Sequence, residues 1–177
     1  MDVLIARTSN TRHLKLLEVV RLHLLGEAQG DPDKVMQTLG PDPVYKVWGA
    51  PERMNMRGSA QVDAYYRHRF GVNRLFVEFD PDRIVVDDDT VVTDLRMRYL
   101  ARGAAIAAPD AYPVGGVDVE HDDDVYLISG RLLVIWPFDG EGRLGGEEAY
   151  TVIDDVRRLT PEEVADSIPA EVLATYS

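Results

Sequence analysis

A histidine lies inside an apolar helical stretch near the start of the sequence. His23 is surrounded by valines and leucines in VVRLHLLGEAQGDPDKV, residues 19–35. A neutral imidazole offers one hydrogen-bond donor and one acceptor, and it titrates near neutral pH. Such a ring can take a proton from a substrate or donate a hydrogen bond to a developing oxyanion. The alternative is a core histidine whose nitrogens are satisfied by a backbone carbonyl or by another side chain.

Several other chemistries are excluded by the residue types present. The chain has no cysteine, so it has no thiol nucleophile, disulfide or cysteine metal site. It contains neither a G-x-S-x-G motif nor a phosphate-binding loop. The acidic segments 87–89 and 121–124 lack the ligand spacing and central glycine of a calcium loop. We therefore interpret them as turns and loop tips, and we expect no metal site.

Length and charge narrow the class of protein further. A chain of 177 residues is expected to form one domain with a core of its own. Its net charge of −12 argues against partners such as nucleic acid or anionic membranes. No signal peptide and no apolar run of about 18 residues is present, so we expect a cytoplasmic protein.

The elements that must position His23 can be read from periodicity and capping residues. Apolar residues at helical spacing predict a first helix over 11–28, and Asp31 followed by Pro32 predicts a short second one. Ser59 is the expected N-cap of a third helix, SAQVDAYYRHRF. The predicted strands are 44–48, 74–80, 83–87, 90–102, 125–138 and 143–155.

Helices and strands are segregated along the chain, which predicts an α+β fold with helices on one face of a curved sheet. The long segment 103–124 interrupts the strands, as a flap or as a floppy insertion. A capping box at Thr160 predicts a short helix in the tail 158–177, and a second short helix is expected after Pro169.

Four motifs in order resemble the SnoaL-like and ketosteroid-isomerase-like superfamily, whose cone-shaped fold is also named after nuclear transport factor two. They are G-D-x-D at 30–33, D-x-x-Y-x-x-W at 42–48, R-G-x-x-x-V-x-x-Y-Y at 57–66 and FDGEGRL at 138–144. The resemblance covers about residues 11–155 of a single domain spanning 1–177. It implies a curved antiparallel sheet wrapped around three N-terminal helices and enclosing a deep apolar pocket. Family members include isomerases, dehydratases, cyclases, hydrolases and binding proteins.

The resemblance also implies a pair of site residues. His23 matches the position of the oxyanion-hole tyrosine of ketosteroid isomerases, and Tyr66 matches a tyrosine that hydrogen-bonds to it. The two catalytic aspartates of those enzymes are replaced by Val47 and Val134. The usual isomerase mechanism is therefore not expected.

Epoxide hydrolases of this superfamily use an Arg-x-Asp pair on a middle strand and another aspartate on the last strand. The inward residues of the middle strand here are expected to be Leu95, Met97 and Tyr99, with Ala149 at the last-strand position. That carboxylate set is also missing.

The last strand supplies one further candidate. Glu147, Ala149 and Thr151 share a face that we interpret as inward, although a one-residue slip would present Glu148 and Tyr150 instead. In a dry pocket Glu147 would be a candidate general acid or base. The alternative is a solvated residue on the rim.

Two functions remain open. One is a cofactor-independent enzyme that acts by acid–base chemistry on an apolar carbonyl or hydroxyl compound, with His23, Tyr66 and Glu147 as catalytic residues. The other is a binding or structural protein without catalysis. In either case a small apolar molecule is the expected partner. Its candidate contacts are Tyr45, Val47, Trp48, Met54, Met56, Tyr65, Phe79, Met97, Tyr99, Val134 and Trp136.

A homodimer is expected through the convex face of the sheet. In the strand 125–138, Leu133 and Ile135 alternate with Leu132, Val134 and Trp136, so the strand is apolar on both faces. Such a strand is usually covered twice, by its own core and by a partner or the tail.

Overall fold

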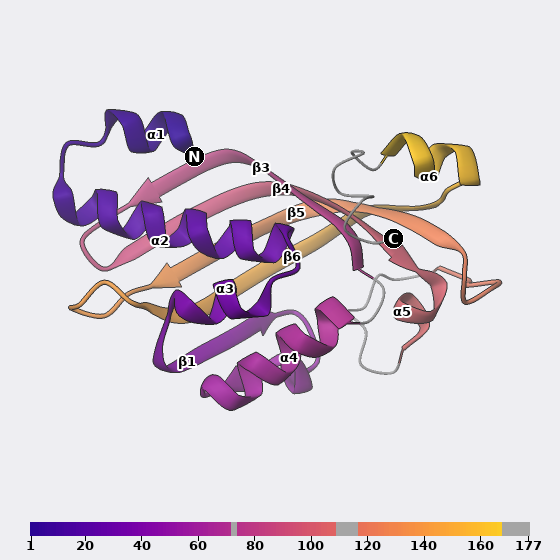
Figure 1. Cartoon of the computed structure of the whole chain (residues 1–177), viewed down its shortest axis with the longest axis horizontal. Helices are drawn as coiled ribbons and strands as arrows, with labels where there is room; N and C mark the ends of the chain where they lie inside the picture. Colours follow the sequence, from indigo (N-terminus) through magenta and orange to yellow (C-terminus); the bar gives the residue numbers. More distant parts are fainter. Residues whose placement is uncertain (72–73, 109–116, 168–177) are drawn as a thin grey trace.

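The computed structural model describes residues 1–71, 74–108 and 117–167. Helices and strands alternate only in the N-terminal part, and long strands dominate the rest (Figure 1). The helices are α1 (Asp2–Arg7), α2 (Thr11–Ala28), α3 (Pro32–Gln37), a 3-10 turn η1 (Glu52–Met54), α4 (Ser59–Gly71), α5 (Gly103–Ala107) and α6 (Pro161–Ser167). The strands are β1 (Leu39–Trp48), β2 (Met56–Arg57), β3 (Arg74–Val86), β4 (Thr90–Arg102), β5 (Val125–Pro137) and β6 (Leu144–Arg158).

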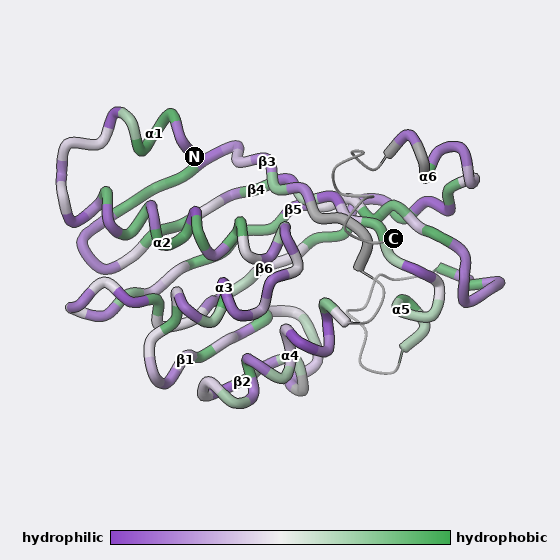
Figure 2. The backbone as a smooth tube through the Cα atoms, viewed as in Figure 1, coloured by the Kyte–Doolittle hydropathy of each residue, from purple (hydrophilic) through white to green (hydrophobic). Residues whose placement is uncertain are grey.

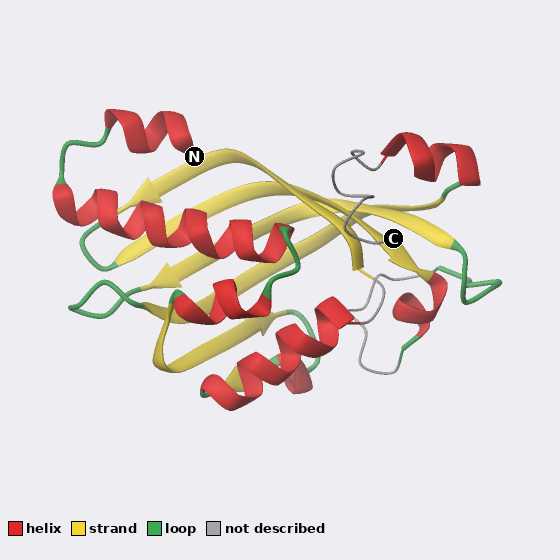
Figure 3. Cartoon of the chain, viewed as in Figure 1, coloured by secondary structure: helices red, strands yellow, loops and turns green. Residues whose placement is uncertain are grey.

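All six strands form one sheet in the order β2-β1-β6-β5-β4-β3, and α2, α3 and α4 cover one face of it (Figure 3). The predicted α+β class is confirmed, but the sheet is mixed instead of purely antiparallel. β1 runs parallel to β6, with Tyr45 beside Glu147 and Val47 beside Ala149. This pairing joins an early and a late segment of the chain, and it places the inward residues of both strands beneath the helices.

Capping side chains fix the N-termini of the helices that lie on the sheet. The Asn10 side chain accepts hydrogen bonds from the backbone N–H groups of Arg12 and His13, which starts α2. Asp31 caps α3 in the same way through the N–H of Lys34. Ser59, expected as an N-cap, is instead the first residue of α4, and its hydroxyl donates to the Pro41 carbonyl.

The main core lies between α2 and the central strands. Leu16, Leu17 and Val20 of α2 pack against Val134 and Trp136 of β5, and all five are buried. The apolar stretches that form this layer run along α2 and the strands behind it (Figure 2). Burial of this surface holds α2, and with it His23, against the sheet.

β3 is one continuous strand, whereas the sequence suggested two strands separated by Pro81-Asp82. The proline sits at an irregularity in the pairing with β4, between Pro81 and Arg83. Because β3 is an edge strand, the missing N–H of Pro81 leaves no inner neighbour unpaired.

The ends of the chain add short helices. α1 was not anticipated from the sequence, and α5 occupies the start of the predicted insertion 103–124. The capping box at the start of α6 is confirmed, because Thr160 and Glu163 each accept a hydrogen bond from the other's backbone N–H. The helix expected after Pro169 lies outside the described residues. Among the described residues, no helix is long and apolar enough to span a membrane.

Candidate functional site

A cluster of polar side chains lies beneath the helices, on the inner face of the β1–β6 pair. His23 and Glu27 come from α2, one helical turn apart, and Tyr66 comes from α4. Tyr45 of β1 and Glu147 of β6 complete the cluster from neighbouring positions in the sheet. The parallel pairing of β1 and β6 therefore brings together residues that are far apart in the sequence.

One nitrogen of His23 is fixed by a threonine that the sequence did not single out. The His23 ring is fully buried, and its Nδ1 lies 2.7 Å from the hydroxyl of Thr38. That hydroxyl donates its only proton to the Val35 carbonyl at 2.6 Å. Thr38 must therefore accept from His23, which places a proton on Nδ1.

The other nitrogen faces a carboxylate. His23 Nε2 lies 2.9 Å from Oε1 of Glu147 and 3.2 Å from the hydroxyl of Tyr66. Two acceptor atoms at 2.9 Å need a proton between them, so His23 and Glu147 share one. Both ring nitrogens of His23 are therefore engaged by neighbouring side chains, Nδ1 by Thr38 and Nε2 by Glu147 and Tyr66.

Two tyrosine hydroxyls lie next to the His23–Glu147 pair, Tyr66 in direct contact with both residues and Tyr45 beside Tyr66. The Tyr66 hydroxyl lies 3.2 Å from carboxylate oxygens of Glu27 and Glu147 and 3.4 Å from the Tyr45 hydroxyl. Burial, followed by the negative charge of Glu147, raises the pKa of both Tyr45 and Tyr66 well above the ordinary value. Both hydroxyls therefore stay protonated, and Tyr66 can donate its one proton to Glu27 or to Glu147.

In the part of the chain that the structure describes, two groups of side chains have the composition of a metal site. The ligand atoms of His23, Glu27 and Glu147 lie within 4.8 Å of one another and could hold a divalent cation, with Thr38 orienting the histidine. The 2.9 Å separation of His23 and Glu147 is that of a hydrogen bond, which the shared proton satisfies without a metal.

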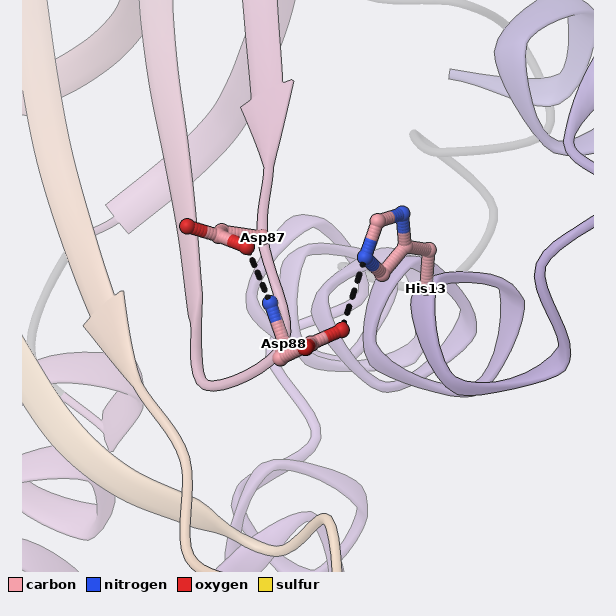
Figure 4. Close-up of side chains that lie close together, drawn as sticks. All are labelled: His13, Asp87 and Asp88. Carbon is pink, nitrogen blue, oxygen red and sulfur yellow. Dashed lines mark hydrogen bonds and ion pairs between the residues drawn. The ribbon is translucent and has the colours of Figure 1, made fainter.

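The second group is exposed and has a structural explanation. His13 of α2 lies 3.1 Å from Asp88, and Asp87 accepts from the backbone N–H of Asp88 (Figure 4). These contacts hold the turn between β3 and β4 against the start of α2. The interpretation of the acidic run 87–89 as a turn is confirmed.

The expected ligand contacts fall into three groups. Tyr45 belongs to the polar cluster, Met56 and Tyr65 pack with Tyr45, Val35 and Val62 beside it, and Met54 is buried in the turn after β1. Phe79, Met97 and Tyr99 form a second apolar cluster together with Ile106 and Ile128. Val134 and Trp136 belong to the α2 core, where the Trp136 indole donates to Thr93 and its ring contacts His23 edge-on at 5.4 Å.

One expected contact is on the wrong face of the sheet. Trp48 is 47% exposed and stacks on Tyr150, with ring centroids 5.7 Å apart. Side chains alternate along β1, so Tyr45 and Val47 point inward while Lys46 and Trp48 point outward. Val47 is half-buried, at the inward position where the isomerases carry an aspartate.

Three residues of the site were missed at the sequence level. Glu27 follows His23 by four residues, a spacing that places both on one face of a helix. Arg69 follows Tyr65 and Tyr66 at helical spacing, where a charge interrupts the apolar stripe of α4. Thr38 carries no comparable signal, because only the turn after α3 brings it to the histidine.

The fold and the site together define the class of protein. The six-stranded mixed sheet covered by three helices is the cone-shaped α+β fold of the proteins related to nuclear transport factor two. The chain belongs to the SnoaL-like domain family, whose sequence profile matches residues 20–122. A comparison with curated proteins finds no match.

Solved structures with the same fold are distant in sequence. An LEH-like epoxide hydrolase from M. tuberculosis is 19% identical, with a TM-score of 0.56 over 78% of this chain and 83% of that one. An epoxide hydrolase/cyclase-like enzyme, SalBIII, with a role in pyran ring formation in the polyether salinomycin, is 14% identical, with a TM-score of 0.57 over 82% and 96%. An NTF2-like protein from Anabaena variabilis is 14% identical, with a TM-score of 0.59 over 84% and 96%.

Proposed function

We propose that this protein is a cofactor-independent enzyme that acts by acid–base chemistry on an apolar hydroxyl, carbonyl or epoxide compound. The observation that carries the proposal is the 2.9 Å contact between Nε2 of buried His23 and Oε1 of Glu147. Solved relatives described as an epoxide hydrolase and as a hydrolase/cyclase-like enzyme support this class of reaction.

Glu147 is the group that meets the substrate. Its Oε1 is held by His23 and Tyr66, and its side chain remains 13% exposed, whereas His23 has no exposed surface. As a carboxylate it takes the proton of a hydroxyl or a water molecule, whose oxygen then attacks carbon. His23 is a positioning residue that keeps Glu147 oriented and supplies or takes the shared proton.

The tyrosines supply hydrogen-bond donors, which complement the proton-accepting carboxylate of Glu147. A hydroxyl that stays protonated donates a hydrogen bond to the substrate oxygen that gains negative charge, such as the leaving oxygen of an opened epoxide. Tyr45 and Tyr66 meet that requirement, since burial keeps their protons in place.

The competing function is binding without turnover. It is favoured by the valines at positions 47 and 134, which remove the two aspartates used by isomerases of the superfamily. The convergence of five ionisable side chains, His23, Glu27, Tyr45, Tyr66 and Glu147, favours the enzyme, because a purely apolar binding site has no need of them.

The test compares two neighbouring carboxylates on β6. Glu147→Gln removes the proposed acid–base group, while Glu148→Gln removes a carboxylate that pairs with Lys46 on the outer face. Turnover is measured by liquid chromatography and mass spectrometry on a panel of alkyl and aryl epoxides, with and without an internal hydroxyl, and of β,γ-unsaturated ketones. We expect Glu147→Gln to lower the rate by about 10²–10⁴-fold and Glu148→Gln to change it less than about twofold.

Either of two results would contradict the proposal. One is full activity in Glu147→Gln. The other is a wild-type protein that turns over nothing in the panel but carries an intact apolar molecule through purification, seen by native mass spectrometry. The second result would establish the binding function instead.

A further inference from the structure

Arg69 places a positive charge beside the cluster without a matching hydrogen bond. It lies in the last turn of α4, one turn beyond Tyr65 and Tyr66, and its side chain is only partly exposed. Its guanidinium carbon lies 5.6 Å from the centre of the Tyr65 ring. Among the described residues, no hydrogen bond or ion pair joins this guanidinium to a carboxylate.

The residues around Arg69 belong to the candidate site or border it, since Tyr65 lies under its guanidinium and packs against Tyr66. Burial acts to lower the pKa of Arg69, but the charges of Tyr65, Tyr99 and Glu27 outweigh it and raise the pKa above its ordinary value, so the side chain stays charged. The other arginine of this turn behaves differently: Arg67 is exposed and pairs with Asp33 and Asp63. A charged guanidinium held over an aromatic ring, with no carboxylate bonded to it among residues 1–71, 74–108 and 117–167, can receive an anion.

We infer that Arg69 binds the carboxylate of the substrate, which makes the ligand class a hydrophobic carboxylic acid. The apolar body of such a molecule would contact Tyr65 and the cluster of Phe79, Met97 and Tyr99. The Tyr65 ring beneath Arg69 packs edge-on against the Tyr66 ring at 5.2 Å, and the Tyr66 hydroxyl lies 3.2 Å from Glu147. The part of this inference that concerns the reacting group of the ligand rests on the proposed function. The part that concerns its carboxylate rests on Arg69 alone.

Binding measurements test the inference without requiring turnover. The probes are decanoate and 4-phenylbutanoate, each compared with its primary amide, which has nearly the same shape but no charge. Isothermal titration of the wild-type protein should give a dissociation constant about tenfold lower for each acid than for its amide. The two probes separate an alkyl from an aryl preference.

Three variants locate the effect. In Arg69→Met the acid and the amide should bind within about twofold of each other, and in Arg69→Lys part of the preference should remain. Arg67→Met removes the same charge from the outer side of the same helix and should keep the full preference. Thermal unfolding of each variant checks that it is folded.

The outcomes distinguish this inference from the proposed function. It is overturned if the wild type binds acid and amide equally, if it binds neither, or if Arg69→Met keeps the preference. Glu147→Gln should bind both acids at least as well as the wild type. A tenfold preference together with unchanged activity in Glu147→Gln would refute the acid–base role alone and leave the carboxylate site standing.

Discussion

His23 owes its role to the two side chains on either side of its ring. Thr38 accepts a hydrogen bond from Nδ1 and thereby fixes the tautomer, and Glu147 shares the proton at Nε2. A histidine held in this way transmits its proton to one defined oxygen. The superfamily resemblance implied a histidine at the position of an oxyanion-hole donor, whereas in the mechanism proposed above the substrate meets the Glu147 carboxylate and not the imidazole.

The buried tyrosines predict how stability depends on alkaline pH. Their pKa values are raised in the folded protein, so above about pH 10 the unfolded chain loses these protons first and the free energy of unfolding falls. Each tyrosine contributes a slope of up to about 1.4 kcal/mol per pH unit until its folded pKa is reached. Urea unfolding between pH 8 and 11 measures this loss.

Tyrosine-to-phenylalanine variants show whether the alkaline loss of stability comes from the two buried tyrosines. Tyr66→Phe and Tyr45→Phe should each flatten the alkaline loss, whereas Tyr150→Phe, on the outer face, should leave it unchanged. Equal slopes in wild type and Tyr66→Phe would show that this hydroxyl is not held in its protonated form.

The sequence predicted His23, Tyr66 and Glu147 as site residues but did not reveal two other charged side chains, Glu27 and Arg69. The pairing of His23 with Tyr66 was predicted from the resemblance, and the period of two along the last strand placed Glu147 inward. Arg69 and Glu27 were overlooked because a charged residue near a helix end is usually solvated. Their burial follows from how α2 and α4 meet the sheet, which local periodicity does not reveal.

The parallel joint between β1 and β6 depends on one glycine. Gly146 has a φ of +127°, and a Cβ added there would lie 1.9 Å from the Val44 carbonyl oxygen. Only glycine allows the two strands to approach this closely. Because Glu147 is the next residue, this contact also sets the position of the proposed acid–base group.

Gly146→Ala should therefore damage both stability and function. Strain and displacement of β1 are expected to lower the free energy of unfolding by at least about 2 kcal/mol, measured by urea denaturation. Turnover should fall even under conditions where the variant is fully folded. Gly140→Ala, in the hairpin turn with no atom within 4 Å of the added Cβ, is the matched control. A Gly146→Ala protein with wild-type stability would refute this account of the joint.

Element types were easier to predict than their neighbours. The helices of the N-terminal part and the long strands appear close to their expected positions, because apolar spacing and caps are local signals. The parallel placement of β1 beside β6 was not predicted, since periodicity reveals which face of a strand is buried and not which strand lies next to it. At Pro81 the sequence predicted a break between two strands, but β3 is continuous there because an edge strand tolerates a proline.

The outer face of the sheet carries an apolar surface that, among the described residues, α6 covers only at one end. Trp48, Tyr150 and Val152 are 47%, 43% and 61% exposed on this face. Val164 of α6 packs instead with Leu100 and Leu127, further along the strands. We propose that a second copy of the chain covers the exposed part, as the two-sided apolar pattern of β5 suggested.

Tyr150→Glu tests the dimer, because it places a charge at the centre of this surface next to Trp48. We expect the mass from light scattering to fall from that of two chains to that of one. Val3→Glu, an equal change on α1 at an exposed position, should leave the mass unchanged. A wild-type mass of one chain would refute the proposal directly.

The order of the strands has a consequence for the growing chain on the ribosome. β1 is made early, but its inner neighbour β6 begins only at Leu144, so that edge stays unpaired while the intervening segments emerge. An open edge of this kind can pair with other chains, and such long-range closure is slow. A nascent chain that stops before β6 would lack Glu147 as well, so a truncated product would be without the acid–base group of the proposed reaction.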